Sequence, residues 1–512
     1  MIVRLYTRQV VIPLVLICSF IFLLMLVQKL SSLSVWDDAY MFVRYADNLL
    51  HYGHLSWNPN DVNTYGLTSP AYLLLVIPLR LLFPTEPAVV MILSSLISGV
   101  FALLTMTWLL LKLIPHLVYR LVLLVIVAIS IVVASDSLAT HLTSGMDTMF
   151  TIWLLTVWIG LLYCSDKFRL MGVIGGLLFW VRPDVMIVVG AVSVILLPSK
   201  NSYSQKSKYA LGVGLTILIL LVLAQLYFGY PLPLAFQVKN FPIYSPQFYE
   251  YYQTTAWNYF REFLVTQPYW LGIILFGSVT QFRQLKWQDK GLLLGCILYC
   301  GYHILFVIPI MGFSQRFFYP LLPILVVLAA RNLTFLLANV PTSFVSRLQN
   351  YPLRALFVPL LLIPAMIQPM PLIVTLVQYT QPDTTPMIAV GRFDLQTAYD
   401  YLYDDNWYRL DELSKLNDDI VIASTEIGLP GVMNPNKRII DLAGLNQANF
   451  AFNGFSADWL MQVENQPDWI YMPFPHYEGM WYSFFENPIF ERDYEFFYAQ
   501  SLGNLNGCCD QA

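Results

Sequence analysis

Long apolar segments separated by short polar ones fill the first three quarters of the chain. A helix needs about 20 mostly apolar residues to cross about 30 Å of hydrocarbon. The pattern predicts eleven crossings, of which two form a short broken pair: 10–30, 88–112, 117–135, 145–163, 170–182, 184–199, 209–228, 266–282, 291–310, 317–337 and 355–378. The chain therefore reads as an α-helical polytopic membrane protein.

One apolar segment, 70–83, does not fit a crossing. Its 14 residues include Pro78 and Arg80, and as a helix they would reach about 21 Å. If it stays on one side, the Lys and Arg residues before position 379 divide 15 to 7 between the two faces. The richer face is normally cytoplasmic. We therefore predict a juxtamembrane helix at 70–83 and a cytoplasmic N-terminus, in an inner or plasma membrane.

The segment 170–199 must turn in its middle, because basic residues at both of its ends belong on the cytoplasmic face. The sequence Arg182-Pro183-Asp184 supplies the turn. Proline also disfavours helical geometry in the residue before it. We predict two short helices that meet at this turn and place charge near the outer surface.

Composition supports the membrane assignment. The chain is 57% hydrophobic and 12% charged, whereas a soluble domain carries about 25% charged residues. An ordinary soluble enzyme, a disordered chain and a coiled coil are excluded, and the net charge of −4 gives no basic excess for nucleic acid. The exception is 379–512, which holds 20 Asp and Glu against 6 Lys and Arg. We predict a transmembrane domain at 1–378 and a soluble extracytoplasmic domain at 379–512.

The tail contains short apolar runs bounded by turn residues. Such runs are typical of buried strands, and they occur as DDIVIAS, KRIIDLAG and DWIYMP. Helices are expected over 394–415 and 455–466, which together predict a small α/β domain. Glu426 follows the first predicted strand. A folded lid without chemistry and an acceptor-binding domain are both open interpretations.

The first outer loop, 31–87, begins with paired acids. Asp37 and Asp38 directly precede AYMFVRYADNLL, whose apolar spacing predicts an amphipathic helix lying on the membrane. Acids at a helix start suit its macrodipole. Alternatively, a carboxylate at the mouth of a cavity can act as a general base toward a hydroxyl. Paired Asp could also hold a divalent metal, so the carboxylates leave three interpretations.

More ionisable residues fall at the predicted outer ends of crossings. They are Asp147, Arg182, Asp184, Lys239 in the second outer loop, and Arg316 after Gln315. Ionisable groups in or near a membrane are functional candidates by default, although Arg316 taken alone could be a snorkelling interface residue. No glycine-rich nucleotide motif and no His or Cys cluster at metal-ligand spacing is found in the sequence.

Several short segments also occur in a fixed order over 36–445. They are WDDAY (36–40), RYA (44–46), NP (58–59), YGLTSP (65–70), SGMDT (144–148), RPD (182–184), FGYPLP (228–233), PLLP (320–323) after Arg316, and RIIDLAGL (438–445). This order resembles the GT-C membrane glycosyltransferases, and most closely the branch that contains mycobacterial terminal arabinofuranosyltransferases. Departures occur at 65–69, at Asp147 where that branch has Glu, and at Leu234 where Asn is common.

The resemblance implies a GT-C fold and an inverting sugar transfer on the outer face. The implied donor is a polyprenyl-phosphate sugar, with a pentofuranose as the sugar of that branch, and the implied acceptor is a cell-envelope glycan or glycolipid. Asp37 is the expected base, with Asp38 as its alternate or orienting partner. Cationic side chains suit the donor phosphate, and we assign Lys239, Arg316 and Arg182 to it. The expected substrate-binding residues are Tyr40, Arg44, Tyr65, Thr68, Ser69, Asp147, Asp184 and Glu426.

A rival class is a lipid or glycolipid transporter of the flippase kind. Transporters also use broken helices and buried charges, but their polar residues lie near the middle of the membrane. Here the candidates lie at predicted outer ends, beside a large predicted outer domain. No organic cofactor is expected in either case.

Overall fold

The computed structural model describes residues 11–31, 35–59, 61–238, 246–307, 313–338, 387–392, 417–473 and 477–499. These residues are mainly helical, with one small sheet. They belong to two compact units. Unit 1 comprises 1–34, 92–219 and 253–381, and unit 2 comprises 35–91, 220–252 and 382–512.

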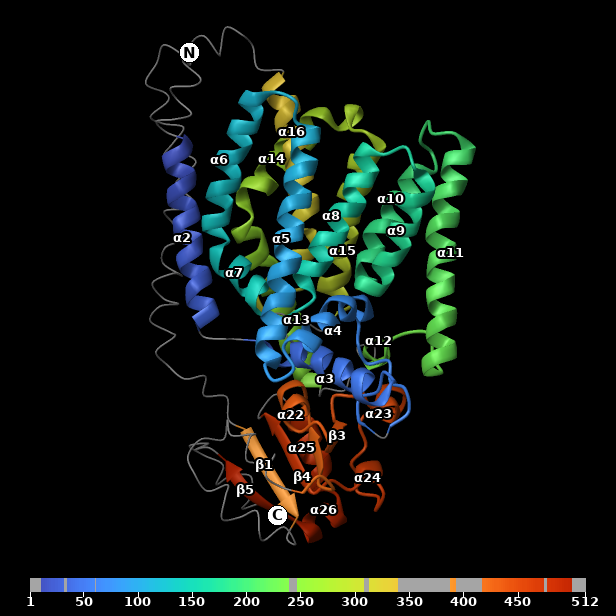
Figure 1. Ribbon diagram of the computed structural model, residues 1–512. Coiled ribbons are helices and arrows are strands. Elements are labelled where there is room, and N and C mark those ends of the chain that lie inside the picture. The colour runs from blue at the N-terminus through green and yellow to red at the C-terminus, as the bar shows by residue number, and fades with distance from the viewer. Residues whose placement is uncertain are drawn as a thin grey trace. The chain divides into compact units, whose positions relative to one another are not determined.

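Unit 1 is built from helices (Figure 1). In chain order its elements are α2 (Ile12–Ser31), most of α5 (Pro87–Leu113), α6 (Leu117–Val133), α7 (Ser135–Thr143), α8 (Thr148–Cys164), α9 (Phe168–Val181), η3 (Pro183–Val185), α10 (Met186–Leu196), most of α11 (Tyr203–Phe228), part of α13 (Pro246–Thr266), α14 (Pro268–Gln281), η4 (Phe282–Gln284), α15 (Trp287–Leu305), η5 (Phe313–Gln315), η6 (Tyr319–Leu321) and α16 (Leu322–Ala338).

Four helices of the described residues are long and apolar enough to cross a membrane: Ile12–Ser31, Pro87–Leu113, Tyr203–Phe228 and Tyr319–Ala338. Two bent pairs raise the number to six if each pair is one span. They bend by 75° between α6 and α7, and by 82° between Thr255–Thr266 and Pro268–Gln284. The protein is thus a helical membrane protein, while eleven crossings remain a prediction, whose last member, 355–378, lies outside the described residues.

The predicted break in 170–199 is confirmed as a helix boundary. Helix α9 ends at Val181, Arg182 is extended, and Pro183 opens η3 before α10. Helix α10 then packs closely on α15, because Gly291 and Gly295 leave room for its backbone. A Cβ at either glycine would lie 2.9–3.0 Å from a Val Cα of α10. Small residues permit this approach between membrane helices.

In unit 2, the first outer loop contains α3 (Asp37–Tyr52), η2 (Pro70–Tyr72) and α4 (Leu73–Leu82). The predicted helix after the Asp pair is present, but every residue from Ala39 to Asn48 is buried. Helix α3 is therefore an enclosed helix, and the expectation of a surface helix with one exposed polar face is wrong. Helix α4 has 10 residues, about 15 Å of rise, so its length agrees with a segment that does not cross.

Unit 2 also contains a five-stranded sheet in the order β3-β2-β4-β1-β5. Strands β2 (Val421–Ser424), β3 (Arg438–Asp441) and β4 (Trp469–Pro473) are parallel neighbours. Strand β1 (Met387–Arg392) pairs antiparallel with β4 and with β5 (Tyr494–Ala499). The three strands predicted from apolar runs are β2, β3 and β4.

Short helices follow and connect these strands. They are α12 (Leu234–Val238), α22 (Gly428–Met433), α23 (Ala448–Asn453), α24 (Ala457–Leu460), α25 (Glu478–Phe485) and α26 (Pro488–Asp493). Of the two helices expected in the tail, 455–466 contains only α24, and 394–415 lies outside the described residues. The predicted small α/β domain is present as a mixed sheet with short helices.

The last division between the two units falls between residues 381 and 382, and the predicted domains at 1–378 and 379–512 stay a prediction. Residues 35–91 and 220–252, which include most of the first outer loop, belong with 382–512. The first outer loop and the tail therefore form one compact unit.

Candidate functional site

Asp37 joins the start of α3 to the loop after β2. Its Oδ2 accepts the Gly428 N–H at 2.8 Å and its Oδ1 accepts the Leu429 N–H at 2.7 Å. The Ile427 backbone also acts as a hydrogen-bond donor toward Asp37, and a carboxylate offers about four acceptor positions, so capacity remains on the carboxylate. The geometry therefore fixes the Asp37 carboxylate while leaving it able to take a proton.

Gly428 is required by this approach. A Cβ on it would lie 1.7 Å from the backbone oxygen of Asp37, far inside any permitted contact. The sequence Glu426-Ile427-Gly428 was expected at a strand end, and β2 does end two residues earlier, at Ser424. The structure adds that this segment meets the Asp37–Asp38 pair.

Burial and clustering raise the pKa values of these carboxyl groups. Burial raises the pKa of Asp37 to about 6, the Leu429 and Gly428 N–H bonds offset part of this, and the Asp38 charge adds to it. Burial raises the pKa of Glu426 well above its ordinary value, with further increments from Asp37, Asp38 and Asp441. A half-buried carboxylate with a raised pKa, beside a second carboxyl group whose pKa is also raised, can exchange protons with a hydroxyl.

Asp441, at the end of β3, is completely buried. Its carboxylate accepts the Gly444 and Asn446 N–H groups and the Asn446 side-chain amide. Asn446 Oδ1 in turn accepts the Tyr45 hydroxyl at 2.8 Å, and that hydroxyl accepts the Gly66 N–H at 3.1 Å. Burial raises the pKa of Asp441 by more than these hydrogen bonds lower it, and the resulting pKa is about 7.

These raised pKa values predict that unit 2 loses stability as pH rises. The unfolded chain releases the Asp441 proton near pH 4 and the folded chain near pH 7, so the folded state holds more protons in between and stability falls across this interval. A pKa difference of one between the folded and the unfolded state corresponds to about 1.4 kcal/mol of stability. We expect an unfolding temperature several degrees lower at pH 8 than at pH 5, and a shallower pH dependence in Asp441→Asn. If the unfolding temperature of Asp441→Asn fell with pH as steeply as that of the wild type, Asp441 would not be the group responsible.

Arg44 is placed in the interior of unit 2. Its five N–H groups meet five acceptors, which are the main-chain oxygens of Trp57, Gly431, Asn434 and Lys437 and the side-chain oxygen of Asn58. The guanidinium also lies 4.8 Å from the Trp57 ring centroid, and the residue is 1% exposed. No donor remains for a substrate, so the structure gives Arg44 a structural role in place of the predicted contact.

The other first-loop candidates differ in their surroundings. Tyr40 is buried near Asp37, whose charge adds to burial in raising the Tyr40 pKa. Tyr65 is buried and stacks on Phe228 with centroids 4.6 Å apart. Thr68 is half-buried, and Ser69 is fully buried with a hydroxyl that has no hydrogen-bond partner among the described residues.

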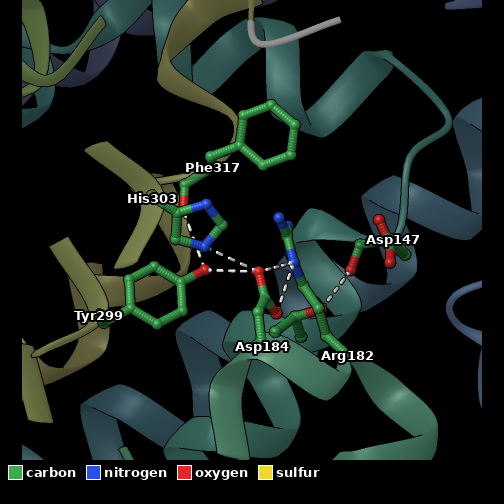
Figure 2. A network of polar contacts seen from close by, with 7 residues as sticks. Asp147, Arg182, Asp184, Tyr299, His303 and Phe317 are labelled. Atoms are coloured by element: carbon green, nitrogen blue, oxygen red, sulfur yellow. Dashed lines mark hydrogen bonds and ion pairs between the residues drawn. The ribbon is translucent and has the colours of Figure 1, made fainter. Parts of the chain in front are cut away.

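Unit 1 contains a second polar group, centred on Asp184 (Figure 2). The Arg182 Nε donates to both carboxylate oxygens of Asp184 at 3.1 Å. The Asp184 Oδ2 also lies 3.0 Å from the Tyr299 hydroxyl and 3.1 Å from His303 Nε2. Tyr299 and His303 are four residues apart, hence on one face of α15.

This group has capacity left for an anion. Arg182 is 6% exposed, and its Nη1 is buried with no hydrogen-bond partner among the described residues. Its guanidinium lies 5.7 Å from the Phe317 ring, and the guanidinium of Arg316 lies 6.0 Å from the same ring. Asp147 is also buried and acts electrostatically on Arg182. Two cations flanking one ring form a candidate phosphate site.

Lys239 lies outside the described residues. In the described part of the chain, no group of three or more His, Cys, Asp and Glu side chains is arranged to hold a metal ion.

Neither a family model, nor a curated protein, nor a solved structure matches the chain.

Sequence reasoning missed the partners that complete both groups. His303, which bonds Asp184 from α15, was not among the predicted site residues. The spacing of Tyr299 and His303 was the available signal. No pattern in the sequence marked Asn446 as a partner. The amides of Gly428 and Leu429 carried no usable signal either, because main-chain N–H donors are alike at every position.

Proposed function

We propose that the protein is a membrane glycosyltransferase of the GT-C kind that uses a polyprenyl-phosphate sugar donor. The observation that carries the proposal is the Asp37 carboxylate, which two backbone N–H groups fix beside Asp38 and Glu426 and whose pKa is raised to about 6. In this role Asp37 takes the proton of the acceptor hydroxyl as that oxygen attacks the anomeric carbon. Asp38 is the alternate base or its orienting partner.

The donor phosphate is assigned to Arg182 and Arg316. The buried Nη1 of Arg182 is a donor that needs an acceptor, because a buried unpaired polar group costs free energy. A phosphate leaving group gains negative charge as its bond to the sugar breaks, and guanidinium groups stabilise it. Direct displacement by the hydroxyl inverts the anomeric carbon. Lys239 keeps its proposed role with no geometric support.

The proposed setting is the outer face of an inner or plasma membrane. It rests on the predicted eleven crossings, the cytoplasmic N-terminus and the extracytoplasmic tail. The transferred sugar is proposed to be a pentofuranose and the acceptor an envelope glycan or glycolipid. Both follow from the motif resemblance alone.

A lipid transporter is the second candidate, because the two bent helix pairs favour it. Helices broken near the membrane interior are common at transporter sites. The cluster of Asp37, Asp38 and Glu426 in unit 2 favours the transferase, because the movement of a lipid alone needs no base. The two functions differ in whether the bond between sugar and phosphate breaks.

The phosphate role predicts a specific response at Arg316. Arg316→Ala should weaken donor use by roughly tenfold to a hundredfold, because a hydrogen bond to a charged group contributes about 1.5–3 kcal/mol. Arg316→Lys should also be impaired, since lysine keeps the charge and loses the planar fork. Transfer rates against donor concentration measure both. Full activity of the lysine variant would indicate an interface anchor, and full activity of the alanine variant would remove Arg316 from the site.

A further inference from the structure

The turn that precedes Arg316 is held in a costly backbone conformation. Ser314 has φ 51° and Gln315 has φ 62°, and no other described non-glycine residue has a positive φ. L-residues rarely occupy this left-handed region, and such residues concentrate where the surrounding structure enforces them for a functional reason. Two in succession, directly before a proposed ligand-binding cation, call for a physical cause.

The cause is a set of side-chain contacts from two other helices. The Gln315 side chain is 0% exposed. Its amide nitrogen donates to Ser137 Oγ at 3.1 Å and to Glu262 Oε1 at 2.9 Å, and its amide oxygen accepts from Thr266 Oγ1 at 3.0 Å. Both N–H groups of the Gln315 amide and its oxygen are engaged in hydrogen bonds, so the side chain has one orientation.

The backbone of the same turn is held from α7. His141 is 0% exposed, and its Nε2 lies 2.9 Å from the carbonyl oxygen of Ser314. A carbonyl only accepts, so Nε2 carries the proton and donates. The Gln315 carbonyl accepts the Phe318 N–H at 2.8 Å and closes the turn.

We propose that Gln315 and His141 are positioning residues that hold this turn so that Arg316 stays beside the Phe317 ring, where Arg182 also lies. They act through Arg316 and do not touch the ligand. Fixing the guanidinium before binding removes the ordering cost that a mobile arginine would add to every encounter with a phosphate. This inference rests on the proposed role of Arg316, and it adds two residues that set affinity for a prenyl phosphate.

The test uses the full-length protein and farnesyl phosphate as the probe. Gln315→Met keeps the side-chain length and removes every hydrogen bond, so the dissociation constant should rise about tenfold. At saturating lipid-linked donor the turnover number should stay within about twofold, because the reacting groups are intact. Ser314→Gly is the matched control, since glycine adopts φ 51° without strain and keeps the carbonyl. It should bind as the wild type does.

Two substitutions at His141 test whether its hydrogen bond to the Ser314 carbonyl matters for binding. His141→Gln presents an amide N–H at a similar distance to the Ser314 carbonyl and should retain affinity. His141→Phe keeps a ring against Tyr319, whose centroid is 4.2 Å away, and removes the donor, so it should weaken binding. Equal affinity in the two variants would overturn the role of His141.

A double-mutant cycle shows whether these residues act through Arg316. Gln315→Met combined with Arg316→Ala should bind farnesyl phosphate no more weakly than Arg316→Ala alone. Additive losses, or unchanged affinity in Gln315→Met, would overturn the inference while leaving the proposed function intact. Wild-type protein that does not bind farnesyl phosphate, or Arg316→Ala that binds it fully, would instead contradict the phosphate role itself.

Discussion

Asp37→Asn should lower the turnover number by about 10²–10⁴, the usual contribution of a general base. The asparagine oxygen can accept one of the two N–H groups that Asp37 accepts from Gly428 and Leu429. Its amide then faces the other donor, which should cost about 1–3 kcal/mol of stability. The measurement is turnover at saturating donor and acceptor, taken together with the unfolding temperature.

Two further variants separate chemistry from stability. Asp38→Asn leaves both Asp37 bonds in place, so loss of turnover there alone would make Asp38 the base. Asp47→Asn is the matched control on α3, because it makes the same chemical change and breaks only the Arg80 ion pair of 2.7 Å. It should keep its turnover even where stability falls. Near wild-type turnover in both Asp37→Asn and Asp38→Asn would remove the carboxylate pair from catalysis.

Arg44→Ala should cause the largest loss of stability. Removing the guanidinium takes the Arg44 donors away from the main-chain oxygens of Gly431, Asn434 and Lys437, and each buried acceptor left unsatisfied costs about 1–3 kcal/mol. The stability of Arg44→Lys should lie between those of the wild type and Arg44→Ala, because an ammonium has three donors where the guanidinium has five. Chemical unfolding in detergent, followed by a signal from unit 2, gives the free energies.

The control for Arg44 is Arg492→Ala. Arg492 is exposed and pairs with its neighbour Asp493, so its loss should leave the unfolding transition unchanged. The competing interpretation, a substrate contact, predicts a stable Arg44→Ala protein with weakened substrate use. That outcome would contradict the structural role argued here.

Local signals in the sequence predicted local structure well. The extended residue Arg182 precedes a proline, and the break between α9 and α10 falls there. Apolar runs bounded by turn residues predicted β2, β3 and β4. The Asp37–Asp38 start of α3 and the ending of β2 before Glu426 were also readable, because each depends on neighbours in the chain.

Contacts between distant segments could not be predicted in the same way. The bonds from Asp37 to Gly428 and Leu429 span nearly 400 positions, and the donors are main-chain groups that every residue type shares. The same holds for Arg44, whose acceptors are mainly carbonyls. An arginine beside an aspartate pair resembles a substrate contact in sequence, and only the enclosure of α3 reveals its structural role.

The proposed reaction breaks the bond between a sugar and a polyprenyl phosphate. The direct measurement incubates the purified protein with a radiolabelled polyprenyl-phosphate pentofuranose and an envelope glycan, and follows both products. We predict one equivalent of free polyprenyl phosphate for each sugar transferred, with inverted configuration at the anomeric carbon by NMR. A sugar that stays on its lipid phosphate while the lipid changes leaflets, with furanose and pyranose donors alike, would contradict the claim.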